Sequence, residues 1–172
     1  MTTEAPDLFI SRVFDAPRAL VYRAFTDPEQ LAAWWGPTGS VRPLDEMEFD
    51  VRPGGYQRFV QVFPNDPSIR AEVHIDLTDV AEGRVLDGVM RVRGHLPGGF
   101  EPFETRFRFE FHDEPDGRTR LEVRQWLPAH VAGATEEGWR QSFAELDAHL
   151  ATTVVARAWA SSSTSPTPPS TS

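Results

Sequence analysis

Apolar and polar residues alternate along the middle of the chain, and this period of two is typical of β-strands with one buried face. The alternation is most regular from Phe103 to Phe111, where four Phe residues and Thr105 alternate with charged residues. One face of the predicted sheet should therefore be apolar and the other wet. With an apolar segment near the N-terminus, the pattern predicts about seven strands, six of them in an antiparallel run: residues 8–14, 47–51, 56–63, 69–77, 84–92, 103–111 and 119–127.

Residues 15–37, between the first two strands, have the pattern of two short helices in tandem. Asp15 and Asp27 are placed to cap them, because each carboxylate precedes a Pro and an apolar periodic segment. The second helix ends in the adjacent pair Trp34 and Trp35. Two neighbouring indoles at this position can either plug a core or roof a cavity.

A long helix is predicted near the C-terminus, with Thr135 placed to cap it. It should lie on the aromatic face of the sheet, because an apolar stripe more than four turns long needs a large apolar partner. The stripe consists of Trp139, Phe143, Leu146, Leu150 and Val154. Residues 161–172 are Ser, Thr and Pro only, so we expect one domain over residues 1–160 and a disordered tail over 161–172.

Composition narrows the classes of partner. Seventeen basic against 26 acidic residues give a net charge of −9, which opposes binding to nucleic acid or to an anionic membrane. The absence of Cys fits a reducing compartment and excludes thiolate catalysis. The N-terminus lacks the pattern of a secretory signal, and no stretch is apolar for long enough to span a membrane. We expect a cytoplasmic monomer whose partner is a small molecule or a protein.

The sequence holds little that points to catalysis. It has no Gly-x-Ser-x-Gly motif, and its five His residues are scattered without metal-ligand spacing, so we predict no metal and no cofactor. His95 is the best candidate for a polar group at a cavity mouth, since it lies in the long segment 93–102, and such loops often rim binding sites.

Several Arg residues hold alternate positions on neighbouring predicted strands and could therefore share one face of the sheet. They could anchor a carboxylate or phenolate ligand, or pair with Glu104, Glu110 and Glu122 across the strands. The set comprises Arg91, Arg93, Arg106, Arg108 and Arg124.

The order of elements, together with local motifs, resembles the START-like (SRPBCC) superfamily, and within it the activator of heat-shock protein 90 ATPase homologue branch. The resemblance implies an α+β helix-grip fold, in which a curved antiparallel sheet wraps the C-terminal helix and leaves a cavity. The turn from Pro64 to Pro67 departs from the pattern usual in bacterial members. The motifs that carry the resemblance are Arg12 to Phe14, Ala16 with Pro17, Thr26 to Glu29, Trp34 to Pro37, Arg52 to Gly55, and Gly138 with Trp139 and Leu146.

Fold alone does not select a function in this superfamily. The first hypothesis is a binding protein that holds a hydrophobic or polycyclic small molecule, either a lipid or a polyketide-like natural product, in an apolar cavity. The candidate ligand-binding residues are Trp34, Trp35, Tyr56, Met90, His95, Phe107, Phe109, Arg124, Trp139 and Phe143.

Three alternatives stay open. A small polyketide cyclase or dehydratase would use His95, Tyr56 and Arg124. A protein-interaction module would act as the co-chaperone members of the family do. A self-resistance protein would sequester an enediyne antibiotic and lose a hydrogen from an exposed glycine; the candidates are Gly88, Gly94, Gly98 and Gly99.

Overall fold

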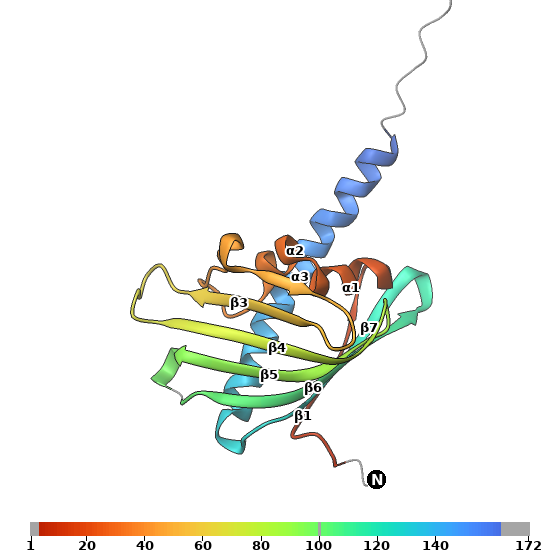
Figure 1. Cartoon of the computed structure of the whole chain (residues 1–172). Helices are drawn as coiled ribbons and strands as arrows, with labels where there is room; N and C mark the ends of the chain where they lie inside the picture. Colours follow the sequence, from red (N-terminus) through yellow and green to blue (C-terminus); the bar gives the residue numbers. More distant parts are fainter. Residues whose placement is uncertain (1–3, 100, 163–172) are drawn as a thin grey trace, which may run out of the picture.

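A computed structural model describes residues 4–99 and 101–162. Its seven strands form a single antiparallel sheet in the order β1-β7-β6-β5-β4-β3-β2, which confirms the predicted strand number and direction (Figure 1). The strands are β1 Leu8–Phe14, β2 Glu48–Asp50, β3 Tyr56–Val62, β4 Arg70–Ala81, β5 Val85–His95, β6 Phe103–Glu114 and β7 Arg118–Trp126. Short 3₁₀ turns occur at η1 Leu44–Glu46, η2 Pro97–Gly99 and η3 Pro115–Gly117.

Helices cover one face of the curved sheet. Figure 1 shows α3 (Ala129–Ser162) crossing that face and continuing well beyond the sheet, with α1 (Arg18–Thr26) and α2 (Pro28–Trp34) beside it. The arrangement is the helix-grip fold that the sequence predicts.

The capping of the two short helices follows the prediction only in part. The Asp27 carboxylate accepts hydrogen bonds from the backbone N–H groups of Glu29 (3.0 Å) and Gln30 (3.3 Å), as expected for an N-cap of α2. The cap predicted at Asp15 is wrong. α1 begins after Pro17 in an extended conformation and has no side-chain cap, which leaves Asp15 outside the helix.

α3 begins earlier than predicted. Its first residue is Ala129, so Thr135 lies within the helix, where its hydroxyl donates to the backbone oxygen of Val131 (2.8 Å). The helix runs to Ser162, past the predicted start of the tail at residue 161, and residues 163–172 lie outside the described part of the chain.

The aromatic face of the sheet and the stripe of α3 form the core. Phe107, Phe109 and Phe111 of β6 are buried, and Phe109 packs edge-to-face on Trp139 of α3 at 5.5 Å between ring centroids. Trp139, Phe143, Leu146 and Leu150 of the predicted stripe are buried. Val154 is 37% exposed. Figure 1 shows that the C-terminal part of α3 continues beyond the sheet.

We predict that truncating a buried residue of the stripe costs much more stability than truncating the exposed residue one turn further along α3. Leu150→Ala should cost about 2–5 kcal/mol of unfolding free energy, since it opens a cavity under a side chain that is 2% exposed. Val154→Ala should change stability by less than about 0.5 kcal/mol. Urea unfolding followed by far-UV circular dichroism measures both, and equal losses would contradict the prediction.

Candidate functional site

A cavity of about 350 Å³ lies between the N-terminal half of α3 and the sheet. Its wall is mainly apolar and is formed by four strands, by α3 and by two loops. The lining residues are Trp35, Pro37, Gln61, Ala71, Val73, Met90, Val92, Leu96, Phe103, Val131, Ala134, Thr135, Glu137, Gly138 and Gln141. A space of this size lies at the lower end of the range for small-molecule sites.

A smaller hollow of about 140 Å³ extends the cavity inward. It shares Trp35, Gln61, Met90 and Gly138 with the larger one and reaches Trp139. The two spaces together form a continuous apolar site beneath Trp35.

The wall at Trp35 is held rigidly. The ring of Trp35 meets Phe59 of β3 at 5.4 Å and Trp139 of α3 at 5.2 Å, both edge-to-face. Trp139 is itself oriented by its indole N–H, which donates to Oε1 of Gln125 on β7 (2.6 Å). The indole that faces the cavity is therefore fixed by contacts from the sheet and from α3.

The two adjacent Trp residues differ in their surroundings, so the alternatives of core plug and cavity wall each apply to one of them. Trp34 is 1% exposed, and its indole N–H donates to the backbone oxygen of Ala24 (2.9 Å), so it plugs the core. Trp35 lies at the cavity wall.

The segment after α2 is tied to α3 by polar contacts. The hydroxyl of Ser142 accepts from the backbone N–H of Gly36 (3.0 Å) and donates to its carbonyl oxygen (3.2 Å). The backbone N–H of Thr38 donates to Oε1 of Gln141 (3.2 Å). Gly36 has φ +94°, a conformation that disfavours residues with a Cβ.

Gly138 leaves unfilled space at the cavity wall because it has no side chain. It lies inside α3, lines both hollows, and a Cβ built on it would find nothing within 4 Å. A glycine inside a helix costs roughly 0.5–1 kcal/mol relative to alanine. The packing of the protein does not require this glycine, and its absent side chain enlarges the cavity.

The mouth carries an acid that stays ionised. Hydrogen bonds from Arg140 and from Gln141 (3.0 Å) lower the pKa of Glu137 to about 2. Among the described residues, no Arg or His lines the cavity, so Glu137 is its one charged lining group.

The structure distributes the predicted site residues over three places. Trp35, Met90 and Trp139 line the cavity or its inner extension. Four others lie in the core and do not line it: Trp34, Phe107, Phe109 and Phe143. The remaining three lie elsewhere: His95 is exposed at the end of β5, while Tyr56 and Arg124 belong to the outer face of the sheet.

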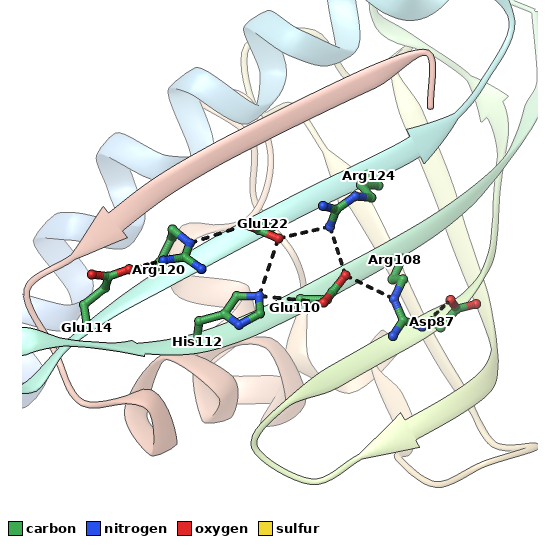
Figure 2. A network of polar contacts seen from close by, with 8 residues as sticks. All are labelled: Asp87, Arg108, Glu110, His112, Glu114, Arg120, Glu122 and Arg124. Carbon is green, nitrogen blue, oxygen red and sulfur yellow. Dashed lines mark hydrogen bonds and ion pairs between the residues drawn. The ribbon is translucent and has the colours of Figure 1, made fainter. Parts of the chain in front are cut away.

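Arg124 is part of an ion-pair network on that outer face (Figure 2). Its guanidinium donates to Oε1 of Glu110 (2.9 Å) and to Oε2 of Glu122 (3.1 Å). Arg108 donates to Glu110 (3.2 Å) and to Asp87 (3.1 Å).

Of the two roles left open for the Arg residues, cross-strand pairing with Glu is observed for Arg124 with Glu110 and for Arg91 with Glu104 (2.9 Å). Arg106 instead lies over the ring of Trp126 at 4.4 Å.

One group of side chains in this network has the spacing of metal ligands. Nε2 of His112 lies 3.4 Å from a carboxylate oxygen of Glu122 and 3.7 Å from one of Glu110. Both carboxylates, however, already contact the guanidinium groups of Arg120 or Arg124. A metal cation would therefore meet fixed positive charge at close range.

Gln61 and Gly138 were missed as site residues. Gly138 carried a usable signal, because a glycine inside a predicted helix calls for a reason. Gln61 lies on a predicted strand with no feature that separates it from an ordinary surface glutamine.

Comparison with known proteins assigns the family. The family described as Activator of Hsp90 ATPase homolog 1-like protein matches residues 15–151, and the chain belongs to it. This confirms the resemblance that the motifs carry. No curated protein matches the chain.

Solved structures share the fold. A Chromobacterium violaceum protein is 25% identical with a TM-score of 0.72, and the alignment covers 83% of this chain and 95% of that one. The AHSA1 protein of Silicibacter pomeroyi is 26% identical with a TM-score of 0.68, covering 85% and 98%. DynU16, from the dynemicin biosynthetic locus, is 19% identical with a TM-score of 0.62, covering 85% and 47%; at that identity it shows the fold alone.

None of the helices in the described ranges 4–99 and 101–162 is long and apolar enough to cross a membrane.

We predict that the outer network makes stability depend on acid pH. Desolvation opposes ionisation of Glu122, but its hydrogen bond with Arg124 and the nearby positive charges together hold its pKa below 4.5. The ionised form is thus favoured by folding, and this stabilisation is complete above about pH 5 and lost as pH falls below 4.5.

Glu122→Gln should therefore lower the unfolding free energy by about 1 kcal/mol near pH 7, with a difference that shrinks towards zero near pH 3. Glu104→Gln, which affects the more exposed pair with Arg91, should cost less than about 0.5 kcal/mol. Urea titrations at several pH values measure these differences. A cost for Glu122→Gln that is equal at both pH values would contradict the assignment.

Proposed function

We propose that the chain binds a hydrophobic small molecule, a lipid or a polycyclic polyketide-like compound, in the cavity between α3 and the sheet. The observation that carries the proposal is the apolar cavity of about 350 Å³ beneath Trp35. The cavity opens to solvent, so its apolar wall is in contact with water. A ligand that covers this wall would remove apolar surface from water, which favours binding.

Gly138 bears on the same proposal, because it lines both hollows and a Cβ there would meet no atom within 4 Å. Its missing side chain leaves room on the cavity side of α3. Shape and apolar area are what a binding site of this kind needs.

The enzymatic alternative lacks support from the geometry. Tyr56 and Arg124 lie on the opposite face of the sheet from the cavity, and His95 is not part of its lining. Glu137, at the mouth, has a pKa of about 2 and is thus poorly matched to general acid or base work near neutral pH.

For the alternative of antibiotic self-resistance, three of the four candidate glycines are exposed, as that alternative requires. Gly94, Gly98 and Gly99 are exposed and flank Leu96, which lines the cavity. The prediction that Gly88 is exposed is wrong: it is buried in β5, where a Cβ would overlap the backbone oxygen of Asp76 on β4. The fold shared with DynU16 is compatible with this version. Mass spectrometry after exposure to an activated enediyne tests it, and an intact chain would exclude it.

We expect a thermal-shift panel of fatty acids, flavonoids, aromatic polyketides and enediyne-like polycycles to identify a class that binds. A ligand at a hundred times its dissociation constant adds about 2.7 kcal/mol, which raises the melting temperature by roughly 5–10 °C for a domain of this size. The co-chaperone-like alternative predicts no shift with any class, and that result would contradict our proposal.

Gly138→Leu should abolish the shift, because the added side chain projects into the open space of the cavity. The variant should fold at least as well as the wild type, since leucine favours helix by about 1 kcal/mol over glycine. Gly133→Leu is the matched control, because Gly133 lies in the same helix, also with nothing within 4 Å of a Cβ, but does not line the cavity. An unchanged shift in Gly138→Leu would place the ligand elsewhere.

A further inference from the structure

Most buried polar side chains around the cavity have partners. Oε1 of Gln125 accepts from Trp139 (2.6 Å), and the Thr105 hydroxyl donates to the backbone oxygen of Arg106 (3.1 Å). Ser142 is satisfied twice by the backbone of Gly36. These groups hold the walls together and have little capacity left for a ligand.

Gln61 differs from them. It is 8% exposed and lines both hollows, yet its side-chain amide makes no hydrogen bond to any residue in the described ranges. The amide lies beside the turn after α2, since its Nε2 would come within 2.6 Å of a Cβ placed on Gly36. The residue as a whole is more than nine-tenths buried, but its amide atoms stay accessible from the cavity they line, beside the Ser40 hydroxyl and the Arg42 guanidinium.

Gln57, on the same strand, shows what an ordinary buried glutamine does here. Its side-chain amide donates to the backbone oxygen of Phe25 (2.8 Å) and so joins β3 to α1. The Gln61 amide has no such partner among the described residues and remains accessible from the cavity. It is therefore available to a hydrogen-bonding group of a molecule that enters the cavity.

The charges around the cavity limit what that partner can be. The single charged lining group is the ionised Glu137, and among the described residues no guanidinium or imidazole lines the wall. A carboxylate would lose part of its hydration in the apolar cavity and would pass the negative charge of Glu137 at the mouth, which disfavours free fatty acids. A neutral carbonyl oxygen can accept from the Gln61 amide without that cost.

We propose that Gln61 is the specificity-determining residue of the site and that it donates a hydrogen bond to the carbonyl oxygen of a neutral, otherwise apolar ligand. The proposal rests on the proposed binding function and adds the chemical class: neutral polycyclic or long-chain ketones in preference to the corresponding hydrocarbons or carboxylates.

Three tricyclic probes with one ring skeleton test this: fluorene, 9-fluorenone and fluorene-9-carboxylate. Their affinities are measured by quenching of tryptophan fluorescence in the full chain. We expect 9-fluorenone to bind about tenfold more tightly than fluorene, the gain typical of one hydrogen bond, and more tightly than the carboxylate. Equal affinity for fluorene and 9-fluorenone would overturn the role of Gln61 and leave the binding function standing. Failure of all three to bind would overturn the binding function as well.

Two variants on β3 separate recognition from structure. Gln61→Leu should remove the preference for 9-fluorenone, keep the affinity for fluorene, and leave the melting temperature unchanged or higher, because the Gln61 amide makes no hydrogen bond to the described residues and its loss leaves none of them unpaired. Gln57→Leu should lower the melting temperature by leaving the Phe25 carbonyl unpaired, and it should keep the preference. A preference that survives in Gln61→Leu, or a large loss of stability there, would contradict the proposal.

Discussion

Trp139 of α3 touches the sheet and the end of α2 at once, and the geometry of the site follows from that position. Its ring packs against Phe109 of β6 and Trp35, while its indole N–H is bound by Gln125 of β7. This contact fixes the distance between α3 and the sheet. Towards the C-terminal side of Trp139, Phe143 and Leu146 fill the interface; towards the N-terminal side, smaller residues leave it open.

Gly138 and Trp139 are adjacent residues of α3 at the boundary between core and cavity, and they have contrasting side chains. The indole of Trp139 fills the core, whereas Gly138, which precedes it, has no side chain and leaves space in the cavity. Hydrogen bonds of Ser142 and Gln141 with the backbone N–H groups of Gly36 and Thr38 hold the segment after α2, which lines the cavity, in place against α3. The cavity is therefore built by rigid elements, which favours a ligand that fits a preformed shape.

The fold was largely predictable, because a period of two over six strands and a stripe on one helix leave few ways to bury the apolar faces. The site was predictable only in part. Aromatic residues read alike whether they fill the core, as Phe107 does, or border the cavity, as Trp35 does. Whether Arg124 can bind a ligand depends on its ion pairs with Glu110 and Glu122, which the sequence does not reveal. Gln61 is a candidate because its amide has no hydrogen-bond partner among the described residues, and no sequence pattern records that.

The account stands on the claim that an apolar ligand enters the cavity beneath Trp35. Nuclear magnetic resonance of the indole N–H groups during titration with 9-fluorenone tests that claim most directly, because Trp35 and Trp139 border the site. Trp126 is the control, since it does not line the cavity and its indole N–H donates to the backbone oxygen of Glu4. We predict that the signals of Trp35 and Trp139 shift and that of Trp126 stays. Unchanged signals from Trp35 and Trp139 at saturating ligand would contradict the account.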